Sequence, residues 1–154
     1  MNKLSQITIE KLCNLINEWQ RRTGPELVTF FNIIGFNDSY GQGFPSRKTY
    51  TEDRLKHING TPDMDKCIIN IFLPINFIGK FDILDNGIKD FNQYLSFDGW
   101  NVVRSGKDII FKRVEDDYFV KNEEAKKAAK STNTEDDFFN VTYDEKKMRT
   151  GNNC

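Results

Sequence analysis

One segment of the chain combines residue types that bind phosphate groups and nucleic-acid bases. Residues 41–50 read Gly-Gln-Gly-Phe-Pro-Ser-Arg-Lys-Thr-Tyr, and further basic residues follow closely. In proteins that bind single strands, Arg and Lys contact phosphates while aromatic rings stack on bases. The segment therefore predicts a binding loop that continues into a basic helix. The candidate binding residues are Phe44, Arg47, Lys48, Tyr50, Arg54, Lys56 and His57.

The same residues also have a purely structural interpretation. Phe44 and Tyr50 would pack into the core, and the glycines would turn the chain. Arg47 would then form an ion pair with Glu52 or Asp53. Residue type and spacing alone leave both interpretations open.

The chain offers few residues for catalysis. His57 is the only histidine, and it lies in a basic segment where a solvated imidazole is more frequent than a catalytic one. The His-Glu-x-x-His, zinc-deaminase and Gly-Lys-Ser/Thr motifs are absent, and the Gly-Gln-Gly turn at 41–43 lacks a third glycine. We therefore expect a protein that is not an enzyme, holds no metal ion and uses no cofactor.

A metal-dependent nuclease is the remaining catalytic hypothesis. The acidic pairs at 63 and 65, 82 and 85, and 116 and 117 would bind a divalent cation only if the fold brought them together. Acidic residues at the start of a helix are explained equally well by the helix dipole. The three cysteines, Cys13, Cys67 and Cys154, lack the close spacing of a zinc motif and are expected as free thiols.

Apolar spacing and capping residues indicate the elements that would position these side chains. The first helix has an apolar stripe from Ile9 to Trp19 and Thr8 as its expected N-cap. Thr23 and Glu26 have the spacing of a capping box. The predicted helices lie over about 9–22, 24–34, 46–58, 61–73 and 83–96, and the strands of a β-hairpin over 100–104 and 108–114. The fold class is therefore α+β, with about five helices followed by a C-terminal β-hairpin and a flexible charged tail.

A hairpin that follows a helix suggests an alternative function, which is nucleic-acid binding by a winged-helix-like arrangement. Arg104, Lys107, Lys112 and Arg113 would then be wing cations near a DNA backbone. The preceding helix is rich in Asp, which makes it a poor reader of the major groove. In this alternative the partner is nucleic acid, bound by the loop at 41–50 together with the hairpin.

Charge divides the chain into two parts. Residues 1–114 carry 15 basic and 13 acidic groups, whereas 115–154 carry 7 and 10. We expect a sensing or interaction domain over 1–114, followed by a charged linker or tail with two helical turns at 123–130. A short aromatic segment at 138–143 would either dock back or begin a further domain.

Composition also limits location and partners. With 22 Lys+Arg and 23 Asp+Glu, the net charge of −1 gives no general attraction to nucleic acid or to anionic membranes. No apolar run reaches the length of about 18–20 residues that crosses a bilayer, and the first residues do not resemble a secretion signal. We expect a cytoplasmic protein without membrane contact.

Several short sequence segments together resemble those of a known family. They are LVTFFNIIGFND at 27–38, GQGFPSR at 41–47, YTEDRL at 50–55, INGT at 58–61 and FNQYLSFDGW at 91–100. Over about 10–114 the chain resembles the N-terminal domain of AbiJ-type bacterial abortive-infection proteins. The resemblance implies an α+β domain in antiphage defence that senses or regulates. It also implies a downstream or neighbouring effector domain as partner, often a HEPN ribonuclease, and a phage-derived trigger of unknown nature.

The resemblance assigns no catalytic residue to this part of the chain. His57 does not meet the Arg-to-His spacing of a HEPN centre, because residues 50–52 are Tyr, Thr and Glu. The leading hypothesis is therefore a non-catalytic sensor or regulatory interaction module that acts through the loop at 36–50 and the helix after it.

Overall fold

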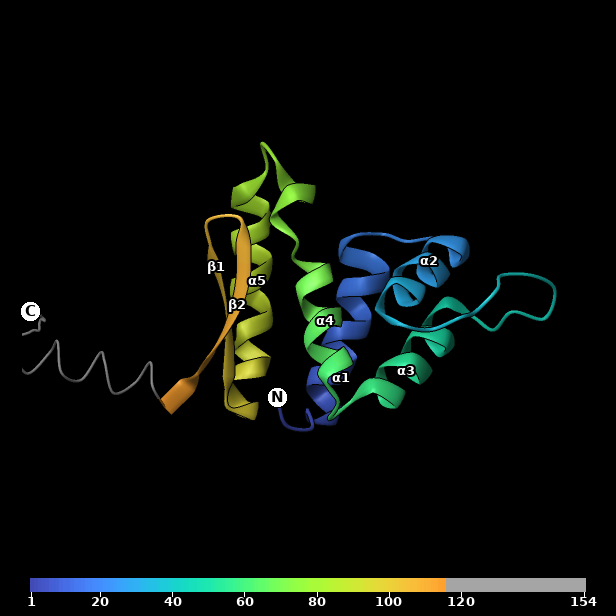
Figure 1. The fold of residues 1–154 in the computed structure, drawn as a ribbon, viewed down its shortest axis with the longest axis horizontal. Coiled ribbons are helices and arrows are strands. Elements are labelled where there is room, and N and C mark those ends of the chain that lie inside the picture. The colour runs from blue at the N-terminus through green and yellow to red at the C-terminus, as the bar shows by residue number, and fades with distance from the viewer. Residues whose placement is uncertain (116–154) are drawn as a thin grey trace, which may run out of the picture. The chain divides into compact units, whose positions relative to one another are not determined.

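The computed structural model describes residues 1–115, and within them the predicted α+β fold is confirmed (Figure 1). Five α-helices precede an antiparallel β-hairpin in this part of the chain. The predicted turns at 123–130 and the aromatic segment at 138–143 lie outside the described residues. The elements are α1 (Gln6–Asn14), a π-helical turn η1 (Leu15–Trp19), α2 (Gly24–Ile34), α3 (Arg47–Ile58), α4 (Pro62–Ile71), a 3-10 turn η2 (Pro74–Phe77), α5 (Phe81–Leu95), a 3-10 turn η3 (Ser96–Asp98), β1 (Trp100–Ser105) and β2 (Asp108–Arg113).

Local capping residues set most helix boundaries. The capping box of α2 is formed, with the Glu26 amide donating to the Thr23 hydroxyl and the Thr23 amide donating to the Glu26 carboxylate at 2.8 Å. Ser46 caps α3 by accepting from the Thr49 amide. Gly35 ends α2 with a φ of 137°, a conformation that favours glycine. These boundaries agree with the predicted ones.

The boundaries of the first helix differ from the prediction. The helix begins at Gln6 with Ser5 as N-cap, so Thr8 is an interior, buried residue and the expected Thr8 cap was wrong. The Ser5 amide and hydroxyl both donate to the Asp98 carboxylate at 3.1 Å, which anchors the helix start from a residue distant in sequence. The helix also ends early, at Trp19 rather than residue 22, through the π-helical turn η1.

The helices form two groups around α1. Figure 1 shows α5 and the hairpin at one end of the domain, α2 and α3 at the other, and α1 and α4 between them. Large apolar side chains from both groups share one core, and Phe31, Phe72 and Phe91 within it are fully buried. Burial of this apolar surface is the main stabilising contribution to the fold.

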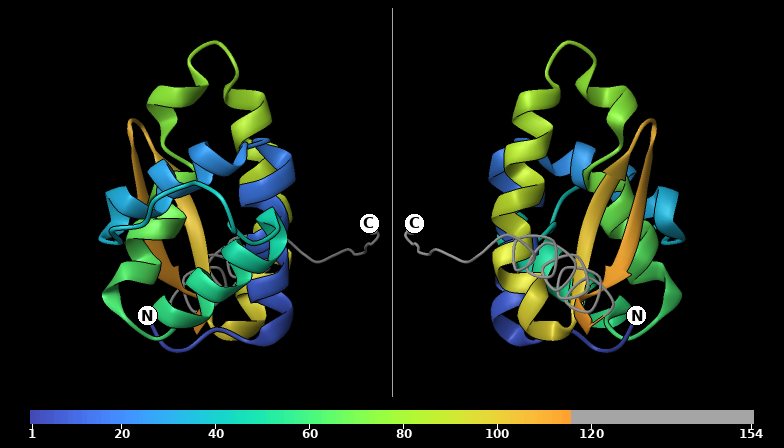
Figure 2. Two further views of the ribbon diagram at one scale, coloured as in Figure 1. Left: turned by 90° about the vertical axis from the view of Figure 1, so that its right-hand side faces the viewer. Right: turned by 90° about the vertical axis from the view of Figure 1, so that its left-hand side faces the viewer.

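The hairpin lies against α5 through β1. Figure 2 (right view) shows β1 next to α5 and β2 on the far side of β1. Val102 faces Phe111 in the ladder, and Val102 and Ile109 are buried on the face toward the core. The turn is the two-residue Gly106-Lys107 segment, where Gly106 has a φ of 63°.

Gly87, in the middle of α5, makes room for an aromatic ring. A Cβ atom at this position would lie 2.3 Å from the Trp19 Cζ2 atom. Trp19 in turn stacks on Phe77 at a centroid distance of 5.4 Å. The absence of a side chain at Gly87 thus allows η1, η2 and α5 to meet at one tryptophan.

We expect Gly87→Ala to lower the free energy of unfolding by about 1–2 kcal/mol. Alanine usually stabilises a helix by about 1 kcal/mol relative to glycine. Here the added methyl would lie 2.3 Å from a Trp19 ring atom, so its cost lies at the upper end of the usual range for overpacking, about 2–3 kcal/mol. Urea denaturation measures the difference. Asn86→Ala, at the exposed neighbouring position, is the control and is expected to keep or slightly raise stability. Equal stability of Gly87→Ala and wild type would contradict the packing argument.

Candidate functional site

The aromatic residues of the predicted binding loop pack inward. Phe44 is half-buried and lies 4.7 Å, between ring centroids, from both Tyr40 and Tyr50. Tyr50 is buried and makes an edge contact with Phe31 in the core. Stacking on a nucleic-acid base would require either ring to leave these contacts.

Asp38 organises the polar contacts beneath this loop. Its carboxylate accepts from Arg54 at 2.8 and 2.9 Å and from the Tyr50 hydroxyl at 2.6 Å. The Arg54 guanidinium, with the Tyr50 hydroxyl as a weaker contributor, holds the pKa of Asp38 below its usual value. Burial, followed by the hydrogen bond to Asp38, raises the pKa of Tyr50 to about 12. Arg54 is therefore committed to an internal network, which also stacks it over Phe36 and Tyr50.

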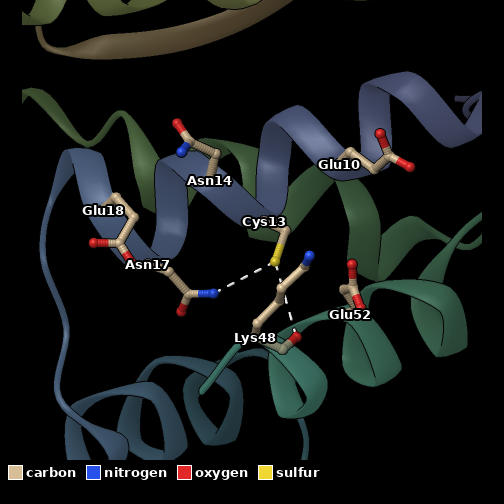
Figure 3. Close-up of a pocket in the computed structure, with 7 residues that line it drawn as sticks. All are labelled: Glu10, Cys13, Asn14, Asn17, Glu18, Lys48 and Glu52. Atoms are coloured by element: carbon tan, nitrogen blue, oxygen red, sulfur yellow. Dashed lines mark hydrogen bonds between the residues drawn. The ribbon is translucent and has the colours of Figure 1, made fainter. Parts of the chain in front are cut away.

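A polar cavity of about 440 Å³ lies between α1 and α3 (Figure 3). Lys48 is exposed at this cavity, and three carboxylates also line it. The Cys13 thiol lies between the Asn17 side chain and the Lys48 carbonyl. The lining residues are Glu10, Cys13, Asn14, Asn17, Glu18, Lys48 and Glu52.

Neither described thiol has the properties of a nucleophile. Burial, and secondly the Glu52 carboxylate, raises the pKa of Cys13 to about 11. Burial raises the pKa of Cys67 to about 12. Both thiols are therefore protonated at neutral pH, whereas a reactive cysteine needs a lowered pKa.

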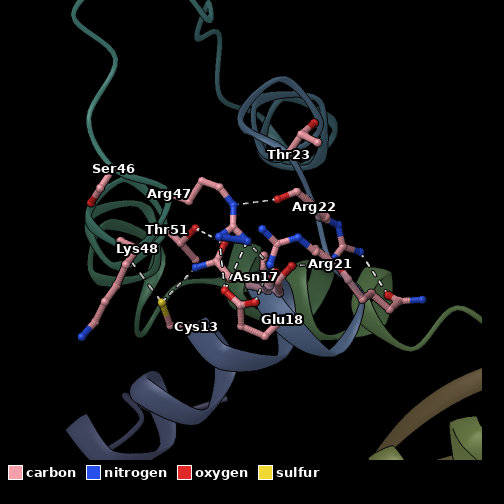
Figure 4. Close-up of polar contacts among 12 residues, drawn as sticks. Cys13, Asn17, Glu18, Arg21, Arg22, Thr23, Ser46, Arg47, Lys48 and Thr51 are labelled. Carbon is pink, nitrogen blue, oxygen red and sulfur yellow. Dashed lines mark hydrogen bonds and ion pairs between the residues drawn. The ribbon is translucent and has the colours of Figure 1, made fainter.

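Arg47 binds the end of the first helix rather than facing solvent (Figure 4). It donates to the Arg22 carbonyl and the Asn17 carbonyl, each at 2.9 Å, and pairs with Glu18 at 3.2 Å. Its partner is thus Glu18, not Glu52 or Asp53 as the structural interpretation expected. The contact with Asn17 satisfies a carbonyl near a helix C-terminus, where carbonyls otherwise lack partners. It also ties α3 to η1.

The remaining candidates in this region are exposed. Lys48 lies at the polar cavity, Lys56 lies on the surface of α3, and the exposed His57 ring packs against Phe36 at a centroid distance of 5.6 Å. Of the seven predicted residues, three line one pocket of about 290 Å³, namely Phe44, Tyr50 and Arg54. The other four do not line it. A ligand-binding role for the seven predicted residues stays a prediction.

Two of the four hairpin cations have defined partners. Arg104 forms a bidentate ion pair with Asp85 of α5 at 2.7 and 2.8 Å and lies over the Phe81 ring. Arg113 lies over the Trp100 ring. Lys107 and Lys112 are exposed. Because Asp85 shares one surface with Arg104, the α5 side of the hairpin is not uniformly basic, and nucleic-acid binding there stays a prediction.

An apolar groove is a concave surface that the sequence did not predict. It has a volume of about 710 Å³ and lies between η2, the start of α5 and the hairpin turn. Ile75 is 70% exposed, Ile78 is 73% exposed and Phe81 is 40% exposed. We call this surface the apolar groove; its lining residues are Leu73, Pro74, Ile75, Ile78, Phe81, Arg104, Gly106 and Lys107. The sequence does contain a signal for this groove, which is the mostly apolar segment LPINFI at 73–78. It lies where turn residues predict a loop.

Residues 1–115 hold no group of three or more His, Cys, Asp or Glu side chains arranged to bind a metal ion. Among the helices of the same residues, none combines the length and apolar character needed to cross a bilayer. Comparison of the chain with protein-family models, with curated proteins and with solved structures finds no match.

Proposed function

We propose that the chain is a non-catalytic interaction module that binds an apolar segment of a partner protein in the apolar groove. The observation that carries this proposal is the exposure of three large apolar side chains, Ile75, Ile78 and Phe81, around one concave surface. Exposed apolar side chains gathered around one concave surface commonly mark an interaction site. A groove lined by large apolar side chains can accept the apolar side chains of a segment of a partner protein.

The charges at the groove define the chemistry of the partner. Arg104 and Lys107 are the only charged residues in its lining, and both are basic. Arg104 is already paired with Asp85, whereas Lys107 has no ion pair with any residue of 1–115. The partner segment should therefore combine apolar anchors for the groove with Asp or Glu placed to reach Lys107.

The resemblance to the AbiJ-type N-terminal domain supplies a biological setting for this proposal. In that setting the partner is a downstream or neighbouring effector domain of HEPN type, and the module regulates it in the cytoplasm of a bacterium during phage attack. Recognition of a phage-derived trigger by the same module belongs to the proposal. Its support is the sequence likeness over 10–114 together with the accessible groove.

The absence of catalysis in this proposal is supported by the chemistry of the described side chains. His57 is exposed on α3 and does not line the polar cavity that Cys13 lines. The thiols of Cys13 and Cys67 have raised pKa values. A thiol that acts at neutral pH would instead need a pKa lowered toward 7.

Selection of peptides from a randomised display library against the 154-residue chain tests the proposal. We expect enriched peptides to contain apolar anchors next to Asp or Glu. Replacing an apolar groove residue by a charge removes burial of one side chain, so Ile78→Asp should weaken their binding by roughly 10–100-fold. The affinity of individual peptides is measured by isothermal titration calorimetry.

The matched control is Ile33→Asp, because Ile33 on α2 is 70% exposed but does not line the groove. This variant should bind the selected peptides like wild type. Equal binding to Ile78→Asp, or a failure to enrich any peptide, would contradict the assignment of the groove. Binding of anionic lipid vesicles that Ile78→Asp abolishes would contradict it too, since it would replace the protein partner by a membrane surface.

A further inference from the structure

We infer that the outer edge of β2 pairs with the same edge of a second copy of this chain. The sheet of the described residues has only two strands, so β2 is hydrogen-bonded on one side, by β1. Figure 2 (right view) shows its other side turned away from α5. Proteins usually cover or pair such an edge, because its free amides and carbonyls are a template for another strand.

Contacts of β1 establish which backbone groups of β2 point outward. The Val102 amide donates to the Asn92 side chain at 2.8 Å, and the Val102 carbonyl accepts from it at 2.9 Å. Val102 therefore points its backbone groups away from β2, and its ladder partner Phe111 must point its own away from β1. Inward and outward backbone groups alternate along each strand. The Val114 amide, which donates to the Gly99 carbonyl at 3.0 Å, points inward as this alternation requires.

The two edges of the hairpin are consequently unequal. Asn92 takes the place of a neighbouring strand at the β1 edge. At the β2 edge, the outward backbone groups of Ile109 and Phe111 make no such bond with any side chain of residues 1–115. The edge available for pairing is therefore that of β2.

The sequence of β2 is complementary to itself about Ile110. In an antiparallel pair of two β2 strands with Ile110 opposite its own counterpart, Asp108 lies opposite Lys112 of the second copy, and the reverse holds by symmetry. Ile109 and Phe111 of the second copy then exchange their outward backbone hydrogen bonds. A slide of two residues in either direction would place Ile110 opposite a charged residue. The charge pairing, together with the alternation of outward-pointing backbone groups along β2, thus selects this register of the two β2 strands.

The side chains of this register are available for pairing. Asp108 and Lys112 are exposed and form no ion pair with another residue of 1–115. Ile110 is 39% exposed on the face of the hairpin away from the core. Pairing would cover Ile110 and join two hairpins into a four-stranded sheet with closed two-fold symmetry.

Sedimentation equilibrium of the 154-residue chain over a range of concentrations tests the inference, with a monomer–dimer equilibrium as the expected result. Asp108→Lys or Lys112→Asp alone creates two like-charged pairs across the two-fold axis and should weaken the dimer by roughly tenfold or more. The double charge reversal should restore it. An equimolar mixture of the two single variants should form a heterodimer, because every Lys then meets an Asp. Asp82→Lys, the same charge change on α5, is the control and should leave dimerisation unchanged.

A covalent trap provides an independent measurement. In a Cys154→Ser background, Ile110→Cys should form an intermolecular disulfide under mild oxidation, since directly opposite residues of a non-hydrogen-bonded pair have the Cα separation that a disulfide needs. Circular dichroism verifies that each variant is folded. A monomeric wild type, a dimer that survives both single charge changes, a mixture that stays monomeric, or an Ile110→Cys variant that does not cross-link would each overturn the inference.

Discussion

Phe72→Ala is expected to lower the free energy of unfolding by about 3–5 kcal/mol, the range for removing a fully buried aromatic side chain. Phe72 is inaccessible to solvent at the end of α4. Its ring lies 5.7 Å from Trp19 and 5.8 Å from Phe91, between centroids. The substitution therefore opens a cavity where the first helix, α4 and α5 meet. Urea denaturation followed by circular dichroism measures the loss.

Phe97→Ala is the matched control for this substitution. Phe97 lies in η3 and is 91% exposed, so its truncation should change stability by no more than about 0.5 kcal/mol. Phe72→Leu retains most of the apolar volume and should fall between the control and Phe72→Ala. A Phe72→Ala variant as stable as the control would show that Phe72 does not contribute to the packing between η1, α4 and α5.

The parts of the fold that the sequence predicted correctly depend on neighbouring residues. Thr23 and Glu26 form their capping box within four residues, and Ser46 caps α3 through the Thr49 amide. The hairpin turn likewise depends on Gly106 and its neighbour. Such interactions are encoded by spacing along the chain, so they can be read without knowledge of the tertiary structure.

The parts that could not be predicted depend on distant residues. The start of α1 is set by Asp98, which binds Ser5 across a separation of 93 residues. The partner of Arg47 is Glu18, from an element that spacing alone does not place beside α3. Glycine is unfavourable inside a helix, yet the place of Gly87 in α5 is explained by its contact with Trp19. In each case a tertiary contact overrides the local preference.

The candidate site shows the same limit more strongly. Residue types predicted a basic and aromatic binding loop, but a sequence does not show whether a cation already has an internal partner. Arg47, Arg54 and Arg104 all have one, whereas the apolar groove arises from residues 73–78 that resembled an ordinary loop. Exposure, which depends on the whole fold, decides which of these surfaces is accessible to a partner.

Asp38→Ala is expected to lower the free energy of unfolding by about 2–3 kcal/mol at neutral pH, because it leaves two partly buried groups without their acceptor. Arg54 loses a bidentate contact, and the Tyr50 hydroxyl loses a bond of 2.6 Å. Chemical denaturation measures the effect. Asp85→Asn is the control for loss of an Asp–Arg pair at an exposed site, and its stability should stay close to that of wild type.

The stability difference between wild type and Asp38→Asn should also depend on pH in one direction. The pKa of Asp38 is lower in the folded state than in the unfolded state, so the folded protein binds this proton less readily. The charged carboxylate therefore contributes its full stabilisation above the unfolded pKa of about 3.9, and that contribution is lost as pH falls through the folded value. Chemical denaturation over a pH series should show a constant difference in the free energy of unfolding between wild type and Asp38→Asn near neutrality. This difference should shrink in acid. A difference that stays constant into strong acid would mean that Arg54 and Tyr50 do not stabilise the ionised form of Asp38.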